Sequence, residues 1–220
     1  MEIFIIGNRG RMGSFLTELF KERGFEVNGT DITAGNTEGR ENEIRNSDAV
    51  ILAVPQDIAL KFVREHSDLE NIIEIGSVKS VFIEFAGRIV SIHPLFGPLS
   101  QASNAKKQII FIEDISPVSK KDMIIKLFGH VEIISMTADR HDRVMADLLV
   151  APYVISVLSS KLNIHGDLTT RSSRTLGCMA DISKAESMEV LRKTISMNPY
   201  SSIVFREIRE GIRELGGEIQ

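Results

Sequence analysis

The sequence predicts an α/β protein in which a Rossmann-type, doubly wound parallel sheet is followed by a smaller all-helical domain. Short apolar runs alternate with helical patterns up to about residue 137, which is typical of a parallel sheet with helices on both faces. From residue 138 onward the pattern is helical and no strand-like run is convincing. We therefore divide the chain into residues 1–137, the sheet domain, and residues 138–220, the helical domain.

The strands of the first domain are expected at residues 2–6, 25–31, 48–55, 71–75, 88–92, 108–112 and 130–134. The run 48–55 is almost continuously apolar, as expected of a strand that is covered on both faces. Helical patterns lie between several of the strands, at residues 14–24, 56–67 and 118–128. In the first of these, apolar residues recur at helical spacing and Gly24 provides a stop.

The second domain is expected to consist of helices only. Residues 138–162 form one long apolar helix broken only at Pro152, and residues 169–196 and 199–215 form further helices. The last of them opens with an Asn-Pro pair, which suits a cap and a first turn. The long helix carries more apolar residues than a small helical domain can bury alone, so we expect a homodimer.

Composition excludes several classes of function. The 220-residue chain has a net charge of −4 and no basic block, so we expect no binding to nucleic acid. Its one cysteine, Cys178, allows no internal disulfide, and neither the cysteine nor the histidines and acids have metal-ligand spacing. Because the chain shows no leader and no apolar run of about 18 residues, we expect a cytoplasmic protein that does not enter a membrane.

A glycine-rich turn follows the first strand and precedes the first helix. Its sequence is GNRGRMG, and the second strand ends 18 residues later in Asp31. Strand, glycine-rich turn, helix, strand and acid form the layout of a dinucleotide-binding site. Glycines let the backbone approach the pyrophosphate, and the helix N-terminus offers unpaired N–H groups. The residues expected to bind the dinucleotide are Gly7, Asn8, Arg9, Gly10, Arg11, Met12, Gly13 and Asp31.

Two residues of this site affect cofactor choice and turn geometry. Asp31 is placed to accept hydrogen bonds from the ribose hydroxyls and repels the extra phosphate of NADP, so NAD is the expected cofactor and NADP is less favoured. Asn8 stands where the usual motif has its first glycine. Asparagine tolerates the left-handed backbone conformation better than most residues, so we expect the turn to be kept. The alternative is a plain strand–helix turn without a ligand.

The candidate catalytic residues follow two later strands. His93 follows the run 88–92 and opens the irregular turn HPLFGP, and Ser77 follows the preceding strand in the segment GSVKS. Open α/β sheets bind ligands at such strand ends. The ordinary pKa of histidine, about 6.5, suits proton transfer at neutral pH. Ser77 could instead cap a helix over residues 78–86. His141, which opens the long helix, is expected to stabilise the junction between the domains.

These motifs together resemble a known family. IIGNRGRMG, IGSVKS, SIHPLFGP and the HD of TADRHDRVMADLL occur in the order and spacing of prephenate dehydrogenases. MNPYSS and the helix after it are similar to that family's C-terminal helical domain, so the resemblance covers essentially the whole chain. It implies oxidation of prephenate with NAD(P) and release of CO2, giving 4-hydroxyphenylpyruvate on the route to tyrosine.

The resemblance also implies roles for individual residues. His93 would hydrogen-bond the ring hydroxyl of prephenate and accept its proton as hydride leaves for the nicotinamide. Ser77 would orient the histidine or the hydroxyl, and Lys79 and Tyr153 would contact the substrate. The chemistry needs no metal. The helical domain would form the dimer and close the site, and the family is often fused to chorismate mutase or prephenate dehydratase.

Two positions depart from the family's pattern. Tyr153 stands where family members commonly carry a histidine, and Asp181 stands where they use an arginine to hold the substrate's carboxylate. Arg171 and Arg174, upstream of Asp181, could bind that carboxylate instead, since guanidinium binds carboxylate in a bidentate fork. The alternatives are arogenate dehydrogenase, a non-catalytic nucleotide-binding module, and a β-hydroxyacid dehydrogenase or deazaflavin-linked NADP reductase. The HPLFGP segment argues against the last two.

Overall fold

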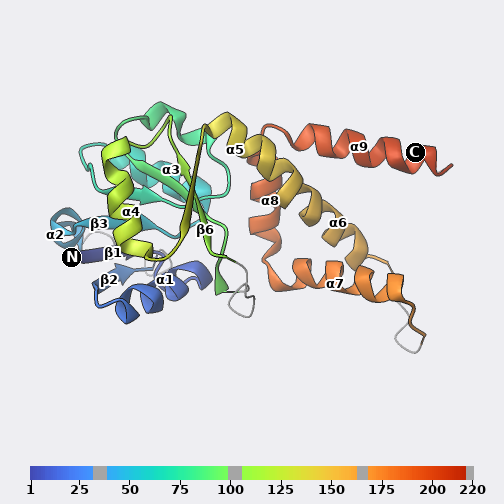
Figure 1. Cartoon of the computed structure of the whole chain (residues 1–220), viewed down its shortest axis with the longest axis horizontal. Coiled ribbons are helices and arrows are strands. Elements are labelled where there is room, and N and C mark those ends of the chain that lie inside the picture. The colour runs from blue at the N-terminus through green and yellow to red at the C-terminus, as the bar shows by residue number, and fades with distance from the viewer. Residues whose placement is uncertain (32–38, 99–105, 163–167, 217–220) are drawn as a thin grey trace. The chain divides into compact units, whose positions relative to one another are not determined.

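A computed structural model of the chain describes residues 1–31, 39–98, 106–162 and 168–216 (Figure 1). The chain divides into two compact units, Met1–His141 and Asp142–Gln220. The division lies inside helix α5 (Ala138–Met145), whereas the boundary expected from the sequence lies just before this helix.

The first unit is built around one sheet, whose strands are β1 (Glu2–Ile6), β2 (Glu26–Thr30), β3 (Ala49–Leu52), β4 (Ile72–Glu74), β5 (Val90–Pro94), β6 (Gln108–Ile112) and β7 (Glu132–Met136). Their order is β2-β1-β3-β4-β5-β6-β7. The strands β1 to β5 run parallel, β6 is antiparallel to β5, and β7 is parallel to β6.

The expectation of a parallel sheet is therefore wrong for the last two strands. The antiparallel pairing continues one residue past β5, where the Leu95 N–H donates to the Gln108 carbonyl at 2.9 Å. A parallel strand would need a crossover connection, usually a helix. The described part of the segment between β5 and β6 contains no such helix, so β6 returns alongside β5.

Both faces of the sheet are covered. On one face, alternate strand residues such as Ile5 and Ile51 form a buried core with α1 (Arg11–Glu22) and α4 (Lys121–Phe128). The intervening strand residues, such as Phe4, are buried as well, so the other face is also covered. The unit further contains α2 (Glu41–Asn46), α3 (Gln56–Glu65) and the 3-10 helices η2 (Ser80–Phe85) and η4 (Val118–Lys120).

The register of β4 and β5 decides which polar side chains meet. In the described ladder Ile73 pairs with Val90, and Glu74 pairs with Ser91. Ile73 and Val90 belong to the core formed with α1 and α4. Because side chains alternate across a strand, Glu74, Ser91 and His93 share the opposite face.

The described residues of the second unit form helices. After α5 the chain passes through a π-helical turn, η5 (Ala146–Val150), into α6 (Ala151–Ser160), and then come α7 (Arg171–Ala185), α8 (Met188–Met197) and α9 (Ser201–Glu214). The core of this unit consists of Ala146, Val150, Val154 and Val204. The π-helical turn ends two residues before Pro152, which lacks an N–H for the helical ladder, so the widened turn accommodates the missing hydrogen bond.

The single helix expected over residues 169–196 is two helices. Ser187 interrupts it and caps α8, because its Oγ accepts a hydrogen bond from the Val190 N–H at 3.2 Å. The last helix begins at Ser201 rather than at residue 199. The turn before it is held by Asn198, whose Oδ1 accepts a hydrogen bond from the Tyr200 N–H at 2.8 Å.

The stretch Ala138–Ser160 is long and apolar enough to cross a membrane by length and composition, with a mean hydropathy of 1.4. This corrects the expectation that no run of that kind exists, although a core helix of a soluble protein meets the same criteria. The stretch is 33% buried and exposes Leu148 and Leu158.

Candidate functional site

The glycine-rich turn lies between β1 and α1. Gly7 has a φ of +87°, which L side chains rarely adopt, and a Cβ on it would lie 2.4 Å from the Ala53 carbonyl oxygen. A Cβ on Gly13, in the first turn of α1, would lie 2.0 Å from the Gly7 carbonyl oxygen. Glycine at these two positions therefore allows β1, β3 and α1 to approach one another closely.

This turn lies at the topological switch point of the sheet. Because β1 lies between β2 and β3, the later strands add on the side opposite β2, and ligands of open α/β sheets bind at such a point. Helix α1 has no side-chain cap and no acidic residue in its first turn, so its N-terminal dipole favours an anion. Gly10 is the N-cap, Arg9 and Arg11 are exposed, and Met12 is partly buried.

Asn8 does not adopt the left-handed conformation that its residue type tolerates. Among the described residues, only glycines have positive φ values. The Asn8 side chain packs over Gly29 of β2, where a Cβ would lie 2.8 Å from the Asn8 Cβ. Its Oδ1 is buried and has no hydrogen-bond partner in the described part of the chain. Asp31 directly follows β2 and is partly buried, so the turn and the acid lie at the same edge of the sheet.

His93, near the carboxyl end of β5, contacts His141 of α5. The Nδ1 atom of His93 lies 3.0 Å from Nε2 of His141, and the rings meet edge to face with centroids 5.1 Å apart. His93 is partly buried and His141 is fully buried. Burial lowers the pKa of His93 well below its usual value, and the nearby His141 and Lys79 lower it further. His93 is therefore neutral, and able to accept a proton, at neutral pH.

His141 is the site residue that the sequence alone does not identify. From the sequence it is expected to stabilise the junction between the domains, whereas the structure brings it to His93, 48 residues away along the chain. Hydrophobic periodicity carries no information about such a contact. The signal that points to it is the HD pair among the motifs that resemble prephenate dehydrogenases.

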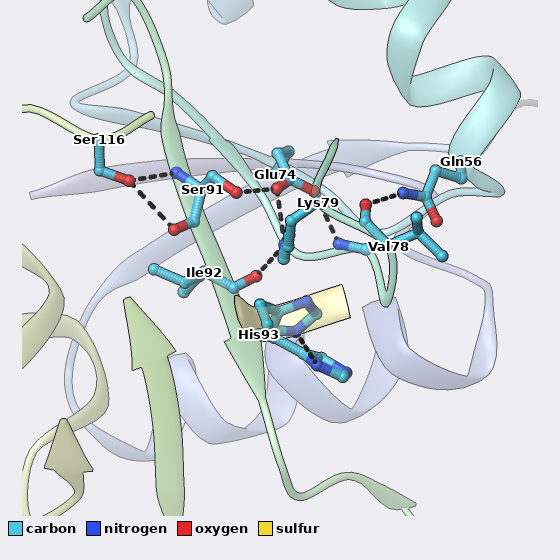
Figure 2. A network of polar contacts seen from close by, with 10 residues as sticks. Gln56, Glu74, Val78, Lys79, Ser91, Ile92, His93 and Ser116 are labelled. Atoms are coloured by element: carbon cyan, nitrogen blue, oxygen red, sulfur yellow. Dashed lines mark hydrogen bonds and ion pairs between the residues drawn. The ribbon is translucent and has the colours of Figure 1, made fainter. Parts of the chain in front are cut away.

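A buried polar network joins the end of β4 to residues of β5 (Figure 2). The Lys79 ammonium group donates to Glu74 Oε1 and to the Ile92 carbonyl, each at 2.6 Å. The Ser91 hydroxyl also donates to Glu74 Oε1, and the Gly76 N–H donates to Glu74 Oε2 at 2.8 Å. Burial raises the pKa of the Glu74 carboxyl group, and the Lys79 ammonium opposes that rise.

The structure changes the roles expected of Lys79 and Ser77. Lys79 is fully buried and its ammonium group donates inside the protein, so its assignment as a substrate contact is corrected. Ser77 is partly buried and does not cap the following helix, because η2 begins at Ser80 and has no side-chain cap. His93 lies inside β5, one residue before its end, and does not follow the strand as expected from the sequence. As β4 and β5 are adjacent and parallel, Ser77 after β4 and His93 near the end of β5 lie at the same edge of the sheet. A catalytic role for Ser77 stays a prediction.

The other predicted substrate residues lie in the second unit. Tyr153 is partly buried on α6. Arg171 and Arg174 are exposed, and their spacing of three residues places them on one face at the start of α7. Asp181, further along α7, forms an ion pair with Lys184 at 2.9 Å. The roles of Tyr153, Arg171 and Arg174 toward a substrate stay predictions.

Comparison with known proteins gives structural relatives but no sequence relative. No family model and no curated protein matches the chain. The chain is similar to prephenate dehydrogenase from A. aeolicus in complex with hydroxyphenyl propionate and NAD+, with a TM-score of 0.75 and 16% identity, over 98% of this chain and 89% of that one. It is also similar to Synechocystis arogenate dehydrogenase, with a TM-score of 0.68 and 14% identity, over 98% and 90%. A Streptomyces aurantiacus imine reductase matches with a TM-score of 0.52 and 18% identity, over 99% and 79%. Identities this low show a shared Rossmann-like fold.

Proposed function

We propose that the chain is an NAD-dependent dehydrogenase that oxidises prephenate. The observation that carries the proposal is the partly buried His93, in contact with His141, at the same sheet edge as the glycine-rich turn. From β1 to β5 there are three strand spacings, about 14 Å. A dinucleotide with its pyrophosphate at the turn would extend its nicotinamide along this edge toward His93. A base beside a hydride acceptor is what oxidation of an alcohol requires.

The residues of the turn fit a dinucleotide. The uncapped N-terminus of α1 suits the pyrophosphate, and Asp31 suits the ribose hydroxyls. The buried Oδ1 of Asn8 is an acceptor whose unmade hydrogen bond costs about 1–3 kcal/mol, and a hydroxyl of the ligand would satisfy it. NAD, when bound, accepts the hydride. The negative charge of Asp31 disfavours NADP.

In the proposed reaction, His93 accepts the proton of the ring hydroxyl. The C–H electron pair at that carbon leaves as hydride, and the O–H pair forms a ring carbonyl. The bond between the ring and its carboxylate then breaks to release CO2, and its electrons make the ring aromatic while the carbonyl oxygen takes up a proton. The product is 4-hydroxyphenylpyruvate. Aromatisation makes the step effectively irreversible.

The contact with His141 leaves two possible arrangements of the hydrogen between the rings, and only one of them suits the proposed reaction. Each neutral imidazole carries one N–H. When His93 Nδ1 carries the hydrogen and donates it to His141 Nε2, the Nε2 atom of His93 keeps its lone pair and can accept the substrate proton. In the opposite arrangement His93 Nε2 carries a hydrogen and cannot act as the base. The proposed reaction therefore uses the first arrangement.

The substrate's carboxylate is assigned to Arg171 and Arg174. Both are exposed on one face of α7, and a guanidinium group binds a carboxylate through two parallel hydrogen bonds. Replacing both by glutamine should raise the KM for prephenate, with a smaller effect on kcat. An unchanged KM would contradict the assignment and make arogenate, which carries an amino group on its side chain, the substrate to test next.

We also propose that a second copy of the chain covers the apolar surface of the second unit. The exposed large apolar side chains of this unit include Leu148, Ile155, Leu158, Leu162, Phe205 and Ile212. A twofold dimer buries such a surface against its own copy. Sedimentation velocity should give a dimer for the unchanged protein and a monomer for the Ile155→Glu/Leu158→Glu variant. A monomeric unchanged protein, or one that floats with lipid vesicles, would contradict this proposal.

Product analysis tests the proposed reaction. Purified protein, NAD and prephenate should yield 4-hydroxyphenylpyruvate, NADH and CO2 in equal amounts, as measured by mass spectrometry and absorbance. Product from arogenate alone would move the substrate but keep the chemistry. NAD binding without product from either compound would contradict the proposal and support a non-catalytic nucleotide-binding module.

A further inference from the structure

A fully buried ion pair lies behind His93, on the same side of the sheet. Glu74 and Lys79 are both 0% exposed, and Lys79 Nζ lies 2.6 Å from Glu74 Oε1. Burying two charges costs about as much free energy as their attraction returns, and apolar residues of similar volume often serve stability equally well. Stability alone is therefore a weak reason for this pair to be here.

The hydrogen bonds of the pair lead to the peptide before His93. Strand β4 ends at Glu74, so the described β4–β5 ladder stops at the pair Glu74–Ser91. Beyond that point the Ile92 carbonyl accepts its hydrogen bond from the Lys79 ammonium group at 2.6 Å. Lys79 thus continues the ladder where the backbone of β4 no longer does, and Glu74 holds Lys79 in place.

The same pair also holds the residue before Ile92. The Ser91 hydroxyl donates to Glu74 Oε1, and the Ser91 N–H donates to Ser116 Oγ at 2.8 Å. The Ser116 hydroxyl in turn donates to the Ser91 carbonyl at 3.1 Å. The two residues directly before His93, Ser91 and Ile92, are therefore fixed by buried side chains, and Figure 2 shows these contacts around β5.

We propose that the Glu74–Lys79 pair is a positioning device for His93: it fixes the peptide that carries the imidazole and sets a positive charge beside it. This inference rests on the proposed role of His93 as the base. Lys79 is a positioning residue and not a catalytic one, because its ammonium group is enclosed.

The charge of Lys79 has a consequence for pH dependence. The groups that act on His93 are His141 of α5 and Lys79, with Glu74 behind Lys79. Burial lowers the pKa of His93 first, and His141 and Lys79 add to the effect. Removing the ammonium group should therefore raise the pKa of His93. The fraction of neutral His93 at mildly acidic pH should then fall.

The test compares variants that remove the charge with a matched control. Lys79→Met alone leaves Glu74 buried without its ion-pair partner, so the double variant Glu74→Gln/Lys79→Met, which removes both charges, is the main test. Lys121→Met is the control, because Lys121 is a partly buried lysine that donates to Ser135 Oγ at 2.9 Å, with Ser135 on β7. Circular dichroism checks the fold of each variant.

The main readout is the NMR titration of the His93 ring in the protein without substrate, assigned by its loss in His93→Asn. Lys79 lowers the pKa of His93 and Glu74 is not among the causes of its shift, so we expect the His93 midpoint to move to higher pH in the double variant and to stay in place in Lys121→Met. The acidic limb of the kcat/KM profile should move in the same direction. A folded double variant with an unchanged midpoint would overturn the proposal. Loss of the fold in both Lys79 variants would also overturn it, because the pair would then be required for stability.

This design separates the two proposals. If the unchanged protein does not turn over prephenate, the proposed function fails while the His93 titration still tests the role of the pair. If the protein turns over prephenate and the titration does not move, only the positioning role fails.

Discussion

Replacing Gly13 with alanine should weaken both the fold and nucleotide binding, because the added methyl group has no room. The new Cβ would lie 2.0 Å from the Gly7 carbonyl oxygen, 2.8 Å from the Gly7 carbonyl carbon and 2.9 Å from the Asn8 Cα. Ordinary contacts begin at 3.4 Å, so α1 would have to move about 1.4 Å away from the turn. All three are backbone atoms, which cannot rotate aside as the end of a side chain would.

Two opposing effects determine how much Gly13→Ala changes the free energy of unfolding. Overpacking a close contact costs typically about 1–3 kcal/mol, whereas a glycine-to-alanine change in an open helical position gains about 0.5–1 kcal/mol. Gly177 in α7 provides the matched control, because a Cβ there meets nothing within 4 Å. We therefore expect Gly177→Ala to be slightly more stable than the unchanged protein, and Gly13→Ala to be less stable than Gly177→Ala by about 1–3 kcal/mol.

Urea unfolding followed by circular dichroism measures the stability difference, since the chain contains no tryptophan. Calorimetric titration with NAD measures binding. The Gly13→Ala affinity should fall by roughly tenfold or more, which corresponds to about 1.4 kcal/mol, while Gly177→Ala should bind as the unchanged protein does. If Gly13→Ala bound NAD normally and matched Gly177→Ala in stability, the close approach of α1 to the turn would not be what the glycine provides.

Further predictions concern the nucleotide pocket and the two histidines. Asp31→Ala should narrow the preference for NAD over NADP in steady-state kinetics, and equal use of both cofactors by the unchanged protein would contradict the role of Asp31. His141→Phe keeps a ring but cannot accept the His93 hydrogen. A positioned base contributes about 10²–10⁴-fold to the rate, so kcat should fall by about 10²-fold or more while NAD affinity stays unchanged. A normal kcat would remove His141 from the mechanism. Because the pKa of folded His93 is lowered, the unfolded chain binds the extra proton first as pH falls below about 6.5. The free energy of unfolding of the unchanged protein relative to His93→Asn should therefore fall on acidification, by up to about 1.4 kcal/mol per pH unit until folded His93 is protonated. Denaturant titrations of both proteins between mildly acidic and neutral pH measure this slope, and parallel curves would show that His93 titrates normally.

The local features of this fold follow from the sequence because they depend on local patterns. The strands expected at residues 2–6 and 108–112 are confirmed as β1 and β6, and the glycine-rich turn lies where the motif predicts it. The direction of β6 is different, because an apolar run looks the same whichever way it pairs. Its antiparallel direction appears only in the pairing of β6 with β5, in which His93 lies opposite Ile110.

In the candidate site, too, local features can be predicted from the sequence and contacts between distant residues cannot. His93 can be predicted because its own neighbours, a strand before it and an irregular turn after it, mark the position. Its contact with His141 depends on where a distant helix folds back. Lys79 looks like a loop lysine in GSVKS, and its burial depends on Glu74, an acid inside the apolar run IIEI. A lone carboxylate on a buried strand signals a buried cationic partner, since an unpaired one is very costly.

The measurement that tests the central claim most directly is the initial rate of NADH formation from NAD and prephenate by the unchanged protein and by His93→Asn, with NAD affinity measured alongside. The account predicts turnover by the unchanged protein, and a loss of turnover in His93→Asn with nearly unchanged NAD affinity, because the base is needed only as hydride leaves. Turnover that survives the loss of His93, or an unchanged protein that binds NAD and oxidises neither prephenate nor arogenate, would contradict it.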